Sequence, residues 1–205
     1  MLVDLTIKEF LEKTASKTPV PGGGSGAALS AAVAAGLVEM VANLTIGKKG
    51  FEEVEIEMRK VAKEAVELKE ELAGNIDKDA EAFNQVMVAF RLPQNTEEEK
   101  ISRSEAIQNS LKQAALVPLG VAQHAFKVIE LAGIAVEKGN KNAVTDGAVG
   151  AMMARTAVLG ALLNVKINLS SIKDSDFVSE VSMQIQPLQE GIKTREEEIL
   201  SRVEI

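Results

Sequence analysis

The 205-residue sequence contains no cysteine, no tryptophan, no tyrosine and a single histidine, His124. Without cysteine there are no disulfides, thiolate metal sites or iron–sulfur clusters, which fits a reducing, cytoplasmic environment. One histidine excludes a multi-histidine metal site within one subunit. We therefore expect no metal centre, and any chemistry must use carboxylates, amides, hydroxyls, lysine or arginine.

The chain also lacks the features of a nucleic-acid-binding or exported protein. Its formal net charge is −7 and only 3% of its residues are aromatic, whereas nucleic-acid surfaces are typically basic and stack bases on aromatic rings. The first ten residues include Asp4, Lys8 and Glu9 and have no signal-peptide apolar core. Hydrophobic residues at 46% and charged residues at 26% indicate one folded domain over residues 1–205.

Helical signals cover almost the whole chain, and no segment alternates like a strand. Thr6–Glu9 and Thr96–Glu99 are capping boxes, and apolar residues recur every three or four positions over long stretches. Forty helical residues span about 60 Å, more than the diameter of about 43 Å of a compact globule of this length. The sequence thus predicts an all-α fold, an elongated multi-helix bundle with long antiparallel helices. The expected helices cover residues 7–15, 27–46, 52–91, 97–138, 143–163 and 176–202, with 164–169 continuing or ending the fifth.

The alanine-rich segment 27–46 is long enough to cross a membrane, but we expect that it does not. Alanine contributes little to insertion, and Glu39 near mid-span would cost about 2.5–3.5 kcal/mol. Close packing of this segment and of the small-residue helix 143–163 explains their composition better. Two such helices in an elongated bundle indicate a symmetric homodimer or a higher homo-oligomer.

The sharpest local signal is Thr18–Gly26, which holds two prolines and four glycines. The segment predicts a shaped loop with Ser25 as the N-cap of the following helix. Free N–H groups and the helix dipole favour an anion there. No Gly-Lys-Ser/Thr follows and no strand precedes, so this is neither a Walker A loop nor a dinucleotide fingerprint. Ligand contact and a simple turn both remain open.

The apolar seam of helix 52–91 is interrupted by Asn75 and Asp79, four residues apart on one face. A carboxylate in an apolar helix interface has a raised pKa, which a general acid or base requires. The alternative is that polar seam residues only set helix register. Asp146, in the first turn of the fifth helix, is a second carboxylate whose alternative role is a favourable contact with the helix dipole.

Polar pairs four residues apart occur on two other helices: Glu39 with Asn43, and Asn164 with Asn168. Amides on a buried face either bind a ligand or hydrogen-bond across the helix contact.

Six elements of the sequence, in this order along the chain, form a distinctive combination: Pro19–Ser25, Met40–Thr45, Asp79–Phe83, Arg91–Pro93, Gly139–Asn142 with Thr145–Asp146, and Asn164–Leu169. In this combination and order the sequence resembles the formiminotetrahydrofolate cyclodeaminase and methenyltetrahydrofolate cyclohydrolase family along most of its length. The combination of the first and last segments is specific, although each is weak alone. Thr145 departs from the serine that the resemblance leads us to expect but keeps a hydroxyl.

The resemblance implies a dimeric helical enzyme acting on a one-carbon adduct of tetrahydrofolate, with its pocket near the subunit interface and no cofactor beyond that substrate. Asp79 and Asp146 are then the catalytic candidates, because carboxylates pair with the cationic formimino and methenyl groups and transfer protons. The substrate-binding candidates are Pro21, Gly22, Gly23, Gly24, Ser25, Asn43, Lys48, Asn142, Asn164 and Asn168, with Lys48 aimed at the anionic glutamate tail.

Two reactions fit these residues. Our first interpretation is cyclodeamination of 5-formimidoyltetrahydrofolate to 5,10-methenyltetrahydrofolate and ammonia. The alternative within the family is hydrolysis of methenyltetrahydrofolate by the same carboxylates. Outside the family, a non-catalytic helical assembly protein would use the glycine loop and the polar seam residues for packing alone.

Overall fold

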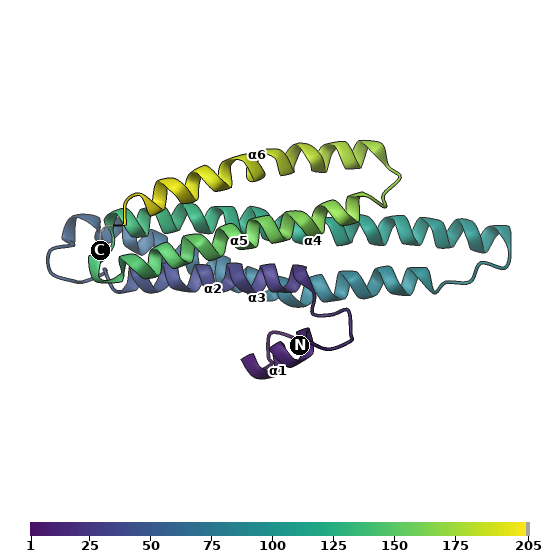
Figure 1. Ribbon diagram of the computed structural model, residues 1–205, viewed down its shortest axis with the longest axis horizontal. Coiled ribbons are helices and arrows are strands. Elements are labelled where there is room, and N and C mark those ends of the chain that lie inside the picture. Colours follow the sequence, from purple (N-terminus) through teal and green to yellow (C-terminus); the bar gives the residue numbers. More distant parts are fainter. Residues whose placement is uncertain (204–205) are drawn as a thin grey trace.

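The computed structural model describes residues 1–203, so the last two residues of the expected domain lie outside the described range. Within it the chain is helical with no strand (Figure 1). The capping boxes at Thr6 and Thr96 form as predicted, with both reciprocal hydrogen bonds. The elements are α1 (Ile7–Thr14), α2 (Gly23–Asn43), η1 (Glu52–Val54), α3 (Glu55–Phe90), α4 (Glu97–Lys138), η2 (Lys141–Ala143), α5 (Val144–Leu169) and α6 (Ser175–Leu200).

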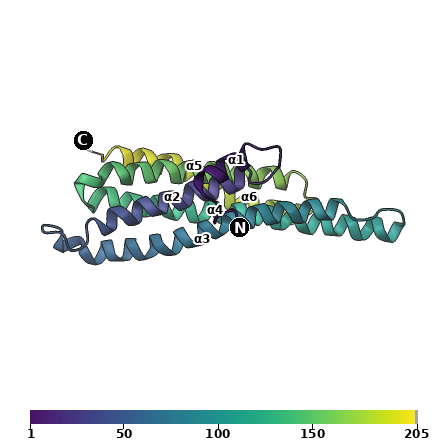
Figure 2. The same cartoon turned by 90° about the horizontal axis from the view of Figure 1, so that it is seen from below.

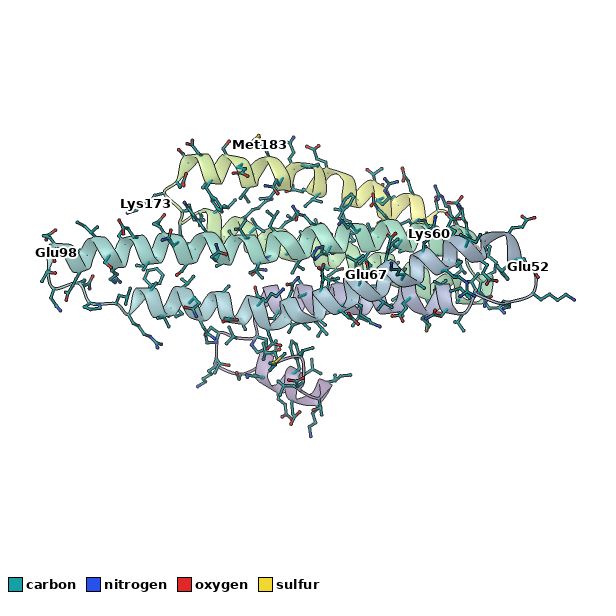
Figure 3. The ribbon with its side chains drawn as sticks, turned by 180° about the vertical axis from the view of Figure 1, so that it is seen from behind. Glu52, Lys60, Glu67, Glu98, Lys173 and Met183 are labelled. Carbon is teal, nitrogen blue, oxygen red and sulfur yellow. The ribbon has the colours of Figure 1, made fainter. Side chains whose placement is uncertain are left out.

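The molecule is an elongated bundle in which α3, at 36 residues, and α4, at 42 residues, form a long hairpin (Figure 1). Glu52 and Glu98 lie at opposite ends of the molecule, before α3 and at the start of α4 (Figure 3). In two perpendicular views the tip of this hairpin extends past the ends of α2, α5 and α6 (Figures 1 and 2). Helix α6 packs outside α4 and α5, where Arg155 Nε lies 2.9 Å from Glu196 Oε2.

Close packing explains the alanine-rich composition of α2 and α5. Their buried alanines have almost no exposed surface, so the two backbones approach each other and α4. Ala27 lies beside Gly160 and Ala34 beside Gly150, which shows that α2 and α5 run in opposite directions. A side chain larger than alanine at these contacts would separate the helices and open the core.

Burial along α3 confirms the predicted seam. Met58, Leu72 and the other apolar seam residues from Val61 to Ala89 are largely buried, and Asn75 is buried among them with 8% of its surface exposed. Asp79 is half-buried, in keeping with its place in the seam. The interruption of the pattern therefore does place two polar side chains within a helix interface.

The start of α2 differs from the sequence prediction. The helix begins at Gly23, four residues earlier than expected, with Gly22 and not Ser25 at the N-cap. Gly22 offers no side-chain cap, and Ser25 lies inside the first turns. The sequence predicts a loop over this glycine-rich segment because glycine disfavours helix interiors. The structure tolerates this because contacts from α3, described below, replace the missing cap.

The N-terminal segment is attached beside this helix start. Leu2 is buried, and the backbone N–H groups of Leu2 and Val3 donate to the Asp77 carboxylate at 2.5 and 3.2 Å. Helix α1 has no buried residue and lies at the side of the bundle (Figure 1). The segment is thus anchored to α3 close to Asp79.

Helices α2 and α4 and the segment Lys141–Leu169 are long and apolar enough, by length and composition, to cross a membrane. About half of each apolar stretch is buried inside the bundle. On α2 and α5 the remainder forms outward-facing apolar stripes. They consist of Leu29, Val33 and Met40 on α2 with Leu44 at its C-cap, and of Val149, Met152, Leu163 and Ile167 on α5.

Candidate active site

The Asp79 carboxylate lies against the first turn of α2, where a cap is missing. The Ser25 hydroxyl lies 2.9 Å from Asp79 Oδ2, in position to donate to it, and the Ser25 backbone N–H also donates to the carboxylate. Free N–H groups at a helix N-terminus favour a negative charge. A side chain from α3 therefore caps α2 across the helix interface.

Opposing effects act on this carboxylate. Burial raises the pKa of Asp79 above the usual value for aspartate, and the hydrogen bonds from the Ser25 hydroxyl and backbone N–H oppose that rise. Desolvation is the larger effect, so the proton is held more tightly than on an exposed aspartate. A raised pKa of this kind is what a carboxyl group needs to act as a general acid or base.

The glycine at position 24 makes this approach possible. A Cβ atom built there would lie 2.0 Å from Asp79 Oδ1 and 2.5 Å from its Cγ, far inside van der Waals contact. At position 23 the corresponding atom would be 3.4 Å from Asn164 Nδ2. The two glycines therefore leave room for Asp79 on one side and Asn164 on the other.

A cavity of about 320 Å³ opens beside Asp79, a size within the range of small-molecule sites. Its wall comes from the start of α2, from α3, from α4 and from the last turns of α5. The lining residues are Pro19, Val20, Gly22, Gly23, Gly24, Asp79, Phe83, Val86, Ala114, Asn164, Ile167 and Asn168.

The two asparagines of α5 are held by their amide nitrogens. Asn164 Nδ2 donates to the Gly160 carbonyl at 2.9 Å, and Asn168 Nδ2 donates to the carbonyls of Ala114 and Asn164, both at 2.9 Å. Their amide oxygens accept no hydrogen bond from the described residues. The cavity thus presents acceptor oxygens and one carboxylate to a ligand that carries N–H groups or positive charge.

The structure brings together six of the twelve predicted site residues at this cavity and places two more directly beneath it. Pro21 and Ser25 are buried and do not line the cavity, and Ser25 contacts Asp79. Ser25 therefore contacts Asp79, whereas the sequence predicts that it contacts the ligand directly. The six that line the cavity are Gly22, Gly23, Gly24, Asp79, Asn164 and Asn168.

The remaining four predicted residues lie toward the end of the helix bundle opposite to this cavity. Asn43 borders a separate hollow of about 390 Å³ with Glu39 and Lys69, which are ion-paired. Lys48 follows α2 and lies over the Phe51 ring, and Asn142 is exposed in η2. Asp146 is in the first turn of α5, 18 residues and about 27 Å of helix from Asn164. Within one chain Asp146 does not share a cavity with Asp79.

The family of the chain follows from comparison with known proteins. The formiminotransferase-cyclodeaminase family profile matches residues 6–187. The chain belongs to this family. It is 44% identical over 183 residues to the methenyltetrahydrofolate cyclohydrolase of Methylorubrum extorquens, a match that covers 89% of this chain and 88% of that protein.

Other members of the formiminotransferase-cyclodeaminase family match over the full chain. Identity to the formimidoyltransferase-cyclodeaminase of Rattus norvegicus is 32% over 203 residues, and the chain spans 38% of that longer protein. The crystal structure of formiminotetrahydrofolate cyclodeaminase from Thermotoga maritima superposes with a TM-score of 0.89 at 32% identity, covering 99% of this chain and 98% of that one. The chain is therefore an enzyme of the folate cyclodeaminase and cyclohydrolase family with an all-helical fold, as the sequence resemblance implied.

Several lining residues were not predicted from the sequence. Phe83 carried a signal, since it lies one helical turn after Asp79 on the same face of α3. Ile167 likewise follows Asn164 by three residues. Ala114 and Val86 carried no such signal, because they match the apolar seam of their helices. Only the packing of α3 against α4 brings them to the cavity.

Replacing Gly24 with alanine tests the close approach of α2 to Asp79. The added methyl group would push the carboxylate away from Ser25, so we expect a loss of about 1–3 kcal/mol in the free energy of unfolding, typical of overpacking. Activity should fall with it. Gly26 is the matched control, because a Cβ there meets nothing within 4 Å and alanine at that helical position should be neutral or stabilising. Equal urea midpoints for the two variants would contradict the contact.

Proposed function

We propose that the chain is a methenyltetrahydrofolate cyclohydrolase, with Asp79 as the acid–base group. The observation that supports it most directly is the half-buried Asp79 carboxylate on the wall of a cavity whose other polar groups are amide oxygens. The similarity to the Methylorubrum extorquens enzyme, which has this name and a comparable length, favours hydrolysis over other reactions of the family.

In the proposed reaction the carboxylate first pairs with the cationic methenyl group. Asp79 accepts a proton from a water molecule as the oxygen of that water bonds to the bridging carbon. The bond from that carbon to N5 of the folate then breaks as N5 takes the proton from Asp79. The hydroxyl group on the carbon loses its proton to solvent, and the carbon remains on N10 as a formyl group. One proton is released for each water consumed. The reaction needs no cofactor beyond the folate substrate.

Cyclodeamination of 5-formimidoyltetrahydrofolate is the second candidate. The structural match to the Thermotoga maritima protein of that name, over 98% of its length, favours it. The same carboxylate would pair with the protonated formimino group and pass a proton to the departing ammonia. Both reactions share the methenyl compound, which one consumes and the other produces.

An absorbance assay separates the two reactions. The protein has no tryptophan or tyrosine, so it adds little to the near-ultraviolet band of methenyltetrahydrofolate. We expect the enzyme to accelerate the loss of this band from methenyltetrahydrofolate. A rising band and released ammonia with 5-formimidoyltetrahydrofolate would assign cyclodeamination, and no change with either substrate would contradict both proposals.

We further propose that two chains form a symmetric homodimer through the exposed apolar stripes of α2 and α5. No charged residue lies among the eight exposed residues of these stripes, whose exposed fractions range from 36% to 68%. A two-fold axis across the middle of α2 and α5 would pack each helix against its copy in the opposite direction. Such packing would remove the apolar stripes from water.

The dimer would also unite the two groups of predicted site residues. In the antiparallel arrangement, Asn43 of the second copy approaches Gly23, and Asp146 of the second copy approaches the end of α5 near Asn168. Lys48 lies beyond Asn43 and would come to the same mouth, where it suits an anionic glutamate tail. Sedimentation should give the mass of two chains. Monomers that bind neutral lipid vesicles would instead assign the stripes to a membrane.

A further inference from the structure

The Ser25 hydroxyl lies between two acceptors and has one proton to donate. Its Oγ is 2.9 Å from Asp79 Oδ2 and 3.0 Å from the Ile76 carbonyl oxygen, and Ser25 has no exposed surface. A serine hydroxyl is one donor with two acceptor lone pairs. It therefore donates to one of these oxygens at a time.

The protonation state of Asp79 determines which acceptor is better. An ionised carboxylate only accepts, and a hydrogen bond to a charged oxygen is about twice as strong as one to a neutral carbonyl. When Oδ2 carries a proton it becomes a donor to Ser25 Oγ, and the Ser25 proton is then free to point to the Ile76 carbonyl. Ser25 Oγ and Asp79 Oδ2 each keep a hydrogen-bond partner in both states, with no movement of heavy atoms.

We propose that Ser25 is a positioning residue for Asp79, whose hydroxyl donates to Oδ2 while the carboxyl group is ionised and turns to the Ile76 carbonyl when it is protonated. The switch holds the carboxyl group in one orientation beside the cavity. Its value for catalysis rests on the proposed function, whereas the hydroxyl switch itself does not.

No other titratable group faces Asp79 among the residues that line the cavity. The start of α2 presents glycines, α4 presents Ala114, and α5 presents the amides of Asn164 and Asn168. On α3 itself, Lys78 and Glu81 are exposed on other faces, and Asp77 is bound to the N-terminal backbone. No other titratable group in the cavity lining therefore contributes to the titration of Asp79.

The test follows the carboxyl carbon of Asp79 by NMR in protein labelled at the aspartate side-chain carbons, with Asp79→Asn to assign the signal. In Ser25→Ala the ionised carboxylate loses one donor, so its titration midpoint should rise by about one pH unit or more. The acidic limb of the pH–rate profile should shift in the same direction. The titration needs no substrate, so its outcome is independent of which reaction the enzyme catalyses.

Ser30→Ala is the matched control, because Ser30 on the same helix donates to the Met153 carbonyl at 3.0 Å and does not touch a carboxylate. It should leave the midpoint unchanged. Ser25→Cys, a weaker donor, should give a smaller rise than alanine. An unchanged midpoint in Ser25→Ala would overturn the proposal, since the hydroxyl would then always donate to Ile76. Failure of both Ser25 variants to fold would also overturn it, by making the hydroxyl a requirement of the core.

Discussion

Asp79→Asn is expected to lower kcat by about 10²–10⁴-fold, the usual contribution of a positioned acid–base group. Asparagine keeps the shape of the side chain and an oxygen that accepts from Ser25, but its amide group does not act as an acid or a base in the reaction. Steady-state rates with methenyltetrahydrofolate measure the loss. Glu81→Gln is the control, because Glu81 is an exposed carboxylate two residues further along α3. Rates that fall equally in both variants would contradict the role of Asp79.

The same variant should be at least as stable as the wild type at neutral pH. Because burial raises the pKa of Asp79 in the folded state, its ionised form costs stability. That cost is absent below the pKa of the unfolded chain, grows as pH rises from there to the higher pKa of the folded state, and stays constant above it. Asp79→Asn should therefore raise the free energy of unfolding, relative to the wild type, by more at pH 7 than at acidic pH. Urea unfolding at the two pH values separates this effect from the loss of chemistry.

Mixing Asp79→Asn with Asp146→Asn is expected to restore activity that neither variant has alone. If each site combines Asp79 of one chain with Asp146 of the other, a mixed dimer has one site with both carboxylates intact. Random exchange in an equal mixture makes half of the dimers mixed, so about a quarter of wild-type activity should return. Co-expression with two different tags isolates the mixed dimer for assay.

Several results would contradict this arrangement. Full activity of Asp146→Asn alone would remove Asp146 from the site, and an inactive mixed dimer would place both carboxylates in one chain's site. Met183 offers a control, since it is exposed on the outer side of α6, away from both stripes (Figure 3). Tagging or substitution there should leave the assembly and the recovered activity unchanged.

The helices and much of the site were predictable because their signals are local. Capping boxes form within four residues, and the seam of α3 repeats every turn, so Asp79 stood out as a polar interruption. The start of α2 was predicted wrongly because its cap comes from another helix. Glycines that disfavour a helix in isolation are required there by Asp79, and no local pattern carries that contact.

Local sequence patterns also do not predict which of the site residues lie close together. Asp79 and Asp146 were both carboxylates at distinctive helix positions, but their distance depends on where α5 starts relative to α3. The roles of Ala114 and Val86 as cavity wall depend likewise on the register between α3 and α4. Sequence spacing fixes which face a residue occupies within its helix and leaves the offset between helices to packing.

The hydrogen bonds that assemble the cavity join residues far apart in the chain: Ser25 to Asp79 and Asn168 to Ala114 each span 54 positions. Closing such loops costs chain entropy before any contact repays it, whereas each helix turn forms from neighbours. Catalytic competence is thus a property of helix docking and not of helix content. A chain whose helices are intact but slightly displaced would look folded by circular dichroism and yet hold no site.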